Sequence, residues 1–268
     1  MTNTTTDIPP NGVGELPFTP LLVPAVVFVA VFALLLALQS IVALRFWRYY
    51  GNAIGMLSGL LLELLGYVAK TMLARDRHNK NGYILYIIGL TLGPTFLSSA
   101  LYLSISALLR VNPSVQCLRI GPRAFSALFV LGDFVCLCFI GVGGSLAAIF
   151  AESPVGVYLM ISGLGTQILV TSIFCVVLVV LSRRLGTDTQ NAKVYWYCVL
   201  LGVAAACLFL RSCWRAAELS GGFNGPLASK EGVFIALDSI PMVVMSVLLV
   251  ILHPGFWFGR QTQIKFIP

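Results

Sequence analysis

Long apolar stretches alternate with short polar segments along the whole chain. A helix rises about 1.5 Å per residue, so roughly 20 apolar residues are needed to cross a bilayer. Seven stretches reach that length, and turns containing Pro, Gly, Asn or charged residues separate them. The stretches are 22–44, 51–73, 83–109, 124–150, 155–181, 195–219 and 233–252. The pattern predicts an all-α polytopic membrane protein with seven transmembrane helices.

The two ends of the chain are more polar than the region between them. Residues 1–21 are rich in polar residues, Pro and Gly, and are predicted to be an N-terminal tail. Residues 22–252 form the predicted membrane domain, and 253–268 a short cytoplasmic tail. Because residues 1–20 lack a basic segment before an apolar one, the first apolar helix is expected to act as the targeting signal.

Composition supports this assignment. The chain is 58% hydrophobic and only 10% charged, whereas soluble domains carry roughly 25% charged residues. The formal charge of +7 lies mostly in the short segments between apolar stretches. We therefore interpret it as loop charge and expect no nucleic-acid partner.

The distribution of Lys and Arg predicts the orientation. With the N-terminus outside, the inner segments hold ten basic residues and the outer segments four. Because cytoplasmic loops carry the excess of Lys and Arg, the prediction is N-terminus outside and C-terminus cytoplasmic. Asn3 begins the one permissible glycosylation sequon and would lie outside, which agrees but is weak evidence.

Several catalytic classes find no support in the residues. There is no phosphate-binding loop of the G-x-x-x-x-G-K-[ST] type. His78 and His253 are too few for a zinc site with three protein ligands. Ser98 and Ser99 have no base beside them in sequence and are assigned to helix packing. We expect no enzyme activity, no cofactor and no bound metal.

The most informative feature is a set of ionisable residues inside the apolar stretches. Arg211, Arg215 and Glu218 fall on one stripe of the predicted helix 195–219. The other members are Glu63, Lys70, Asp133 and Asp238. Since a charge at mid-membrane costs at least ~2.5 kcal/mol, four acids and three bases within the spans predict internal pairing.

Several of these residues are expected to lie at similar depths in the membrane. Helices 51–73, 195–219 and 233–252 are expected to meet around a polar cavity opening outward, with Arg211 and Asp238 as an ion pair. Exchanging the charges of this pair is then expected to restore function lost by either single change. Asp133 lies deeper, toward the inner half. We assign substrate binding or translocation to Glu63, Asp133, Arg211 and Asp238, and a supporting ion-pair network to Lys70, Arg215, Glu218 and Glu231.

Structural roles remain open alternatives. Arg215 and Glu218 could serve only to fix helix register, and Lys70 and Glu218 could extend to the membrane interface. Gly51, Gly55 and Gly59 predict close helix approach, favoured within one chain over a dimer contact. Pro94 and Pro241 are expected to kink their helices and free carbonyls that could line a cavity.

These motifs resemble the fungal lipid-translocating exporter family, the RTA-like proteins linked to aminocholesterol and sphingoid-base resistance. The most specific part is Arg211-Ser-x-x-Arg215-x-x-Glu218, followed by Gly221 or Gly222, Glu231, Asp238, Met242 and His253-Pro-Gly255. Matching residues elsewhere are Glu63-x-x-Gly66-Tyr67, Pro94, Ala100, Tyr102, Asp133, Gly143-Gly144, Gly163 and Gln167. The chain departs from the pattern where Lys70 and Ile140 replace an expected Arg and Gln, and where the Arg expected soon after Tyr102 is absent or displaced to Arg110.

The resemblance implies a fungal seven-helix protein, often of the plasma membrane. It implies export or transbilayer movement of sphingoid long-chain bases or similar amphiphiles, and resistance to toxic lipids. Its partners would be membrane lipids or amphiphilic small molecules. Such a substrate joins a cationic amine to a long alkyl chain, so acids at membrane depth, such as Glu63, Asp133 and Asp238, would serve the amine.

Two other functions compete with transport. A seven-helix receptor or stress sensor fits the topology, although no predicted outer loop carries a cysteine pair, and neither Asp-Arg-Tyr nor Asn-Pro-x-x-Tyr occurs in place. A retinal protein would need a lysine within 233–252, which has none. A membrane hydrolase of lipid amides would need more histidines.

Overall fold

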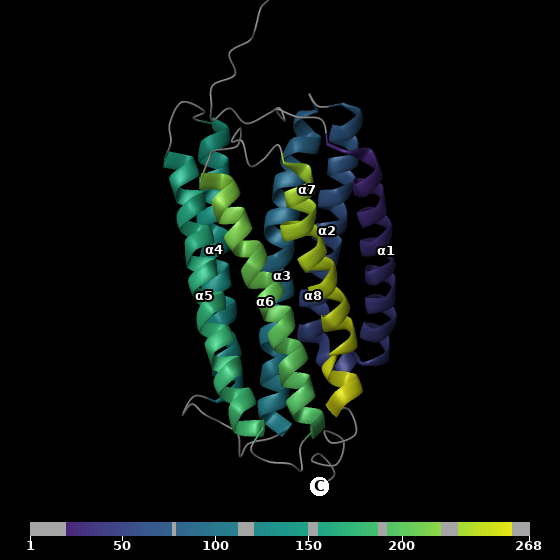
Figure 1. Ribbon diagram of the computed structural model, residues 1–268, viewed down its shortest axis with the longest axis vertical. Helices are drawn as coiled ribbons and strands as arrows, with labels where there is room; N and C mark the ends of the chain where they lie inside the picture. The colour runs from purple at the N-terminus through teal and green to yellow at the C-terminus, as the bar shows by residue number, and fades with distance from the viewer. Residues whose placement is uncertain are drawn as a thin grey trace, which may run out of the picture.

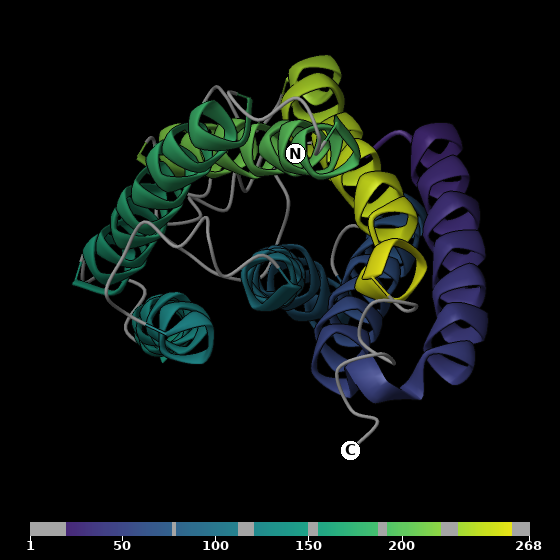
Figure 2. The ribbon, with the colours of Figure 1, turned by 90° about the horizontal axis from the view of Figure 1, so that it is seen from below.

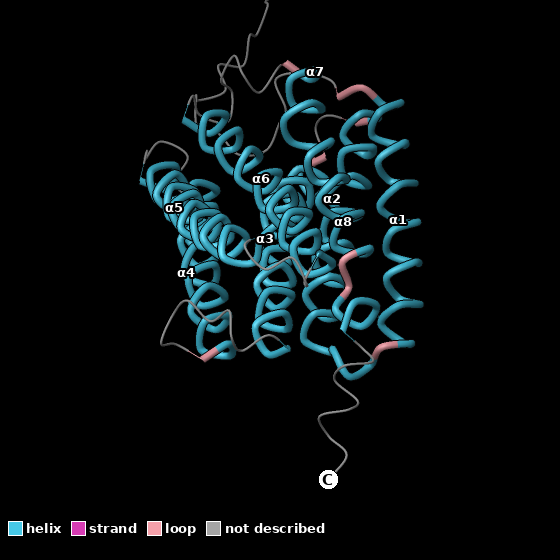
Figure 3. Tube along the Cα trace, turned by 60° about the horizontal axis from the view of Figure 1, so that its bottom comes forward, coloured by secondary structure: helices cyan, strands magenta, loops and turns pink. Residues whose placement is uncertain are grey.

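The computed structural model describes residues 20–76, 79–111, 121–149, 155–186, 192–220 and 230–258. Asn3, Gly221 and Gly222 lie outside these ranges. Within them the secondary structure is helical, with no strand (Figure 3). The elements are α1 Leu22–Arg45, η1 Trp47–Tyr49, α2 Tyr50–Arg75, α3 Lys80–Val111, α4 Pro122–Ile149, α5 Val155–Gly186, α6 Ala192–Ser220, α7 Glu231–Phe234, η4 Ile235–Ser239 and α8 Ile240–Ile251.

Seven of the described segments are long and apolar enough to cross a membrane, so the predicted number of spans is confirmed. The predicted ends differ from the observed ones by about five residues at most, as in α5, which continues to Gly186. The last span combines α7, the π-helical segment η4 and α8. The chain is an integral multi-pass membrane protein; which end faces the cytoplasm stays a prediction.

The helices follow one another around an elongated bundle (Figures 1 and 2). Each contacts its neighbour in sequence, and α8 also contacts α1, which closes the ring between the first and last spans. Helix α3 contacts α2, α4, α6 and α8. It is therefore the central helix, and most side chains of the site described below lie around it.

Glycines allow α2 and α3 to approach closely. A Cβ on Gly89 would lie 2.7 Å from the Cα of Gly66, and one on Gly59 would lie 2.6 Å from Leu97. A Cβ on Gly55 would lie 2.6 Å from Ser99. These contacts confirm the prediction that the glycine repeat packs within the chain.

The two prolines act differently from one another. Pro94 lies inside α3, which remains helical from Lys80 to Val111. Pro241 lies in the first turn of α8, directly after η4. A proline clashes with the carbonyl four residues before it and donates no hydrogen bond, and a wider π turn is one way to absorb this. The winding changes directly before Pro241, and Asp238 lies within the π-helical segment; the kinks at Pro94 and Pro241 stay predictions.

Candidate functional site

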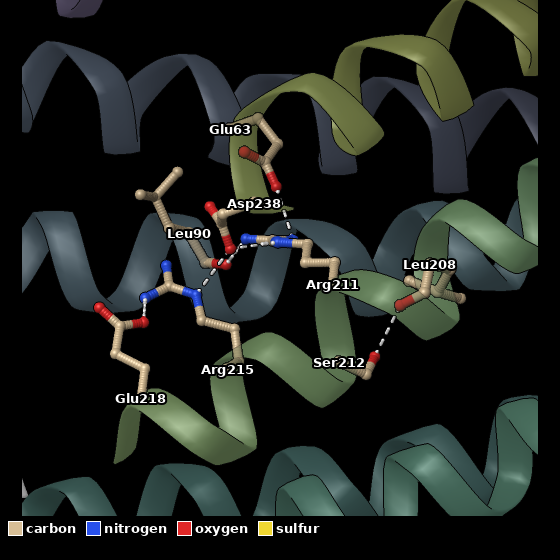
Figure 4. Close-up of polar contacts among 8 residues, drawn as sticks. All are labelled: Glu63, Leu90, Leu208, Arg211, Ser212, Arg215, Glu218 and Asp238. Carbon is tan, nitrogen blue, oxygen red and sulfur yellow. Dashed lines mark hydrogen bonds and ion pairs between the residues drawn. The ribbon is translucent and has the colours of Figure 1, made fainter. Parts of the chain in front are cut away.

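Arg211 of α6 lies at the centre of the bundle, with only 1% of its surface exposed. Its Nε donates to Asp238 Oδ1 at 2.8 Å, and its Nη1 donates to Glu63 Oε1 at 3.1 Å. Its Nη2 donates to the backbone carbonyl of Leu90 (Figure 4). The planar guanidinium thus joins α2, α3 and η4, which a single ammonium could not do with the same geometry. The predicted Arg211–Asp238 pair is confirmed.

The Leu90 carbonyl is free to accept because of Pro94. In a regular helix the amide N–H of residue 94 would donate to the carbonyl of residue 90, and proline has no N–H. The predicted freeing of a carbonyl is thus realised at Leu90, where Arg211 takes the place of the helical donor.

Arg215, one turn beyond Arg211 on α6, extends the cluster. Its Nε lies 2.9 Å from Asp238 Oδ1, and its Nη1 donates to Glu218 Oε2 at 2.9 Å. One carboxylate oxygen of Asp238 therefore lies between two arginines (Figure 4). Such sharing stabilises the ionised form of both side-chain types in a water-poor interior.

Lys70 and Glu231 form a second pair, 3.2 Å apart. Glu231 also accepts from the backbone N–H of Leu21, at 2.9 and 2.8 Å. The Phe234 ring connects this pair to the arginines, because Lys70 Nζ lies 3.9 Å and Arg215 Cζ lies 5.4 Å from its centroid. Lys70 is therefore buried and paired with the first residue of the last span.

We call these seven side chains the charge network: Glu63, Lys70, Arg211, Arg215, Glu218, Glu231 and Asp238. It contains four acids and three bases. Two of its buried acid oxygens, Glu63 Oε2 and Asp238 Oδ2, have no hydrogen-bond partner. Arg211 lies nine residues before the end of α6 at Ser220, about 14 Å along the axis, so it lies at membrane depth. Glu218 and Glu231 lie near the ends of their helices.

Gly93 makes room for one member of the network. A Cβ at this position would lie 2.9 Å from both Cγ and Oε1 of Glu63. A larger residue would displace the carboxylate that Arg211 binds. Gly93, Leu90 and Phe234 were not among the residues predicted for the site. Only Pro94, four residues after Leu90, indicated a free carbonyl.

Asp133 of α4 lies apart from the charge network. It accepts from Ser98 Oγ and, at 3.4 Å, from Tyr102 Oη, both on α3. The Tyr102 ring packs against Phe129 and Phe174, with centroids 5.2 and 4.6 Å away. No basic side chain in the described part of the chain pairs with Asp133. Ser98, which the sequence analysis assigned to packing, is thus a partner of this buried acid.

The predicted translocation residues therefore fall into two groups. Glu63, Arg211 and Asp238 lie together in the charge network, and Asp133 lies on another face of α3. The supporting residues Lys70, Arg215, Glu218 and Glu231 all belong to the network. Their roles in substrate binding stay predictions, as does the cavity opening outward.

Comparison with known proteins places these residues in a family. Residues 56–261 match the family described as RTA1 like protein, a range that includes the whole charge network. The chain is 26% identical to the sphingoid long-chain base transporter RSB1 of Saccharomyces cerevisiae, over 91% of this chain and 74% of RSB1. It is 24% identical to protein RTM1, over 75% of this chain and 66% of RTM1.

A third relative is protein RTA1 of the same yeast, 23% identical over 77% of this chain and 69% of RTA1. No solved structure matches the chain. The family match covers more than half of the sequence and confirms the resemblance drawn from the helix motifs. The chain belongs to the RTA1-like protein family.

Proposed function

We propose that this protein moves cationic amphiphiles, and sphingoid long-chain bases above all, across the bilayer or out of it. Family membership and the name of the RSB1 relative support a transporter related to membrane lipids. In this proposal the protein is not an enzyme, lies in the plasma membrane with its N-terminus outside, and gives resistance to toxic lipids.

The observation that carries the proposal is the imbalance of the charge network. Four acids face three bases, and Glu63 Oε2 and Asp238 Oδ2 are buried without partners. An ammonium brings one positive charge and hydrogen-bond donors but no acceptor. It would neutralise the excess acid and donate to an unpaired carboxylate oxygen, which is expensive to leave unpaired in a membrane interior.

The arginines have a separate role in this proposal. Without Arg211 and Arg215, three or more buried carboxylates would repel one another and destabilise the empty protein. With them, the site is close to neutral when empty and weakly anionic overall. A cationic headgroup can then bind and leave, because the attraction comes from one excess negative charge rather than from the three that would remain without the arginines.

Reconstitution tests the proposal directly. Purified protein in proteoliposomes is expected to move sphingosine between leaflets, but not its N-acylated analogue, which carries no charge. The Glu63→Gln, Asp238→Asn double variant is expected to lose this movement. Asp76→Asn, at the end of α2 outside the network, is the matched neutralisation and is expected to keep it. Unchanged movement in a double variant that reaches the membrane would remove the proposal.

The same assay separates transport from sensing. Inactive vesicles, together with altered signalling in cells that lack the protein, would favour a seven-helix receptor or stress sensor that regulates lipid asymmetry indirectly. Activity of the purified protein alone favours the transporter.

A further inference from the structure

The first and last spans lie side by side and run in the same direction (Figures 1 and 2). Two contacts fix their register. Near one end, the backbone N–H of Leu21 donates to Glu231. Near the other end, the rings of Phe46 and His253 lie 5.6 Å apart. Residues between these two contacts therefore lie at matching levels of the two helices.

Polar residues recur along the last span at intervals of seven. Ser239, Ser246 and His253 are two helical turns apart, so they fall near one side of the span. All three are fully buried. The Oγ atoms of both serines and the Nε2 atom of His253 have no hydrogen-bond partner.

These serines differ from others in the protein. Ser40, Ser104 and Ser212, for example, donate to the carbonyl four residues before them in their own helices. That bond is the usual way to satisfy a serine inside a helix. Ser239 and Ser246 do not form it, so their hydroxyls are available to another partner.

The first span contributes an equally unusual residue at the same level. Gln39 precedes Phe46 by seven residues, as Ser246 precedes His253, and therefore lies level with Ser246. It is fully buried, and neither its amide nitrogen nor its amide oxygen has a partner. Nearer the charge network, Tyr67 of α2 stacks on Phe32 at 5.3 Å, and its buried hydroxyl lies beside the hydroxyl of Ser239.

Unpaired polar atoms at membrane depth are costly, and a buried water molecule bound to several of them removes that cost. We propose that the seam between α1 and the last span is a hydrated path. It runs from the charge network at Asp238 and Ser239, past Gln39 and Ser246, to His253. Buried Met242 lies three residues after Ser239, and buried Leu249 lies three residues after Ser246. Along the last span, apolar side chains therefore alternate with the polar side chains that bind water.

The path gives a polar headgroup a route between the charge network and the end of the bundle at His253. This second part of the inference rests on the proposed function, whereas the presence of water does not. Methionine is unbranched and flexible, so Met242 can move aside when a headgroup passes.

Cysteine labelling tests whether water is present between α1 and the last span. Gln39→Cys and Ser246→Cys are made in a chain whose seven native cysteines are replaced. Leu38→Cys and Val247→Cys are the controls, because these neighbours lie on the outer, lipid-facing surface with 43% and 36% exposure. A charged methanethiosulfonate reacts with the thiolate, which forms only in contact with water. We expect at least tenfold faster labelling at positions 39 and 246 than at the controls; equal rates would overturn the path.

Hydroxyl-radical labelling of the unaltered protein in nanodiscs gives an independent measurement. Met242 and Tyr67 are expected to be oxidised severalfold faster than Met160, which is also buried but packs between α4 and α5. Equal protection of all three would contradict a hydrated seam, whether or not the cysteine variants fold.

Sphingosine then tests the headgroup route. If the amine uses the path, saturating sphingosine slows labelling of Ser246→Cys, and uncharged N-acylsphingosine does not. Labelling that sphingosine leaves unchanged retains the water but overturns the headgroup route. Transport measured in the same vesicles shows separately whether the proposed function holds.

Discussion

Arg211 on α6 donates to the Leu90 carbonyl on α3, which Pro94 leaves without its helical donor. A proline inside one helix thus prepares a binding position for an arginine on another. Replacing Pro94 with alanine would supply the missing N–H and make the two donors compete for one carbonyl.

We therefore expect Pro94→Ala to keep the fold but to lower sphingosine movement severalfold. The melting temperature should change little, since the regained helical bond offsets the weakened arginine contact. Flip rates and thermal unfolding of the purified variant check this. Full activity in Pro94→Ala would show that the Leu90 contact does not matter for transport.

Replacing Arg211 alone should destabilise the protein more than replacing Arg211 together with its acidic partner Glu63. Arg211→Gln leaves the Glu63 carboxylate without its basic partner in a water-poor interior, whereas Asp238 keeps Arg215. Breaking a buried pair in this way costs about 3–5 kcal/mol. Adding Glu63→Gln removes the stranded carboxylate and should recover part of the loss. Thermal unfolding in detergent of both variants measures the difference; equal melting temperatures would contradict the contact.

The simple exchange of charges between Arg211 and Asp238 is not expected to restore function. An aspartate at 211 would face Glu63, and an arginine at 238 would face Arg215, because Asp238 binds both arginines. This replaces the sequence-based expectation of rescue. Expression level and flip rate of the exchanged variant provide the check, and near-normal values would show that the contacts to Glu63 and Arg215 are dispensable.

Gly93→Ala is expected to impair transport by displacing Glu63. The new Cβ would lie 2.9 Å from the Glu63 carboxylate, which is too close for a normal contact. Gly141→Ala is the matched control, because nothing lies within 4 Å of the position its Cβ would take. That control should be neutral or stabilised by about 0.5–1 kcal/mol. Identical flip rates in the two variants would refute the packing argument.

Asp133→Asn separates a structural role from a translocation role. An asparagine keeps one carbonyl oxygen that accepts from Ser98. Its NH2 group replaces the oxygen that faces Tyr102 and can donate to the Tyr102 hydroxyl oxygen instead, so folding should be preserved within about 1 kcal/mol. If Asp133 contacts the substrate amine, sphingosine movement falls at least tenfold. Transport and unfolding are measured on the same preparation, and a stable variant with normal transport excludes Asp133 from the route.

The fold could be predicted from the sequence because each span is a separate, long apolar stretch. Apolar length alone specified seven helices, and the rule that buried charges pair led to the Arg211–Asp238 contact. Lys70 was predicted as a network member from its place inside an apolar stretch, and Glu231 from the family motif. What the sequence could not indicate were contacts between a charge and an uncharged partner on another helix, such as Asp133 with Ser98, or Arg211 with the Leu90 carbonyl.

Those contacts depend on how the helices rotate against each other. Gly59, Gly66, Gly89 and Gly93 set the distance between α2 and α3, and a small change in that distance would move Glu63 away from Arg211. The π-helical segment was missed for a similar reason. Pro241 signals a disturbance, but whether the chain bends or widens depends on what packs around it.

The closure of the bundle between its first and last spans has a consequence for biosynthesis. Glu63 enters the membrane with α2, its partner Arg211 arrives only with α6, and Asp238 comes with the final span. During translation Glu63 lacks its partner until α6 is made, and Arg211 and Arg215 lack Asp238 until the last span is made. A nascent chain that stops before η4 retains both arginines but lacks Asp238, which gives cellular quality control a distinct feature of an unfinished protein to recognise.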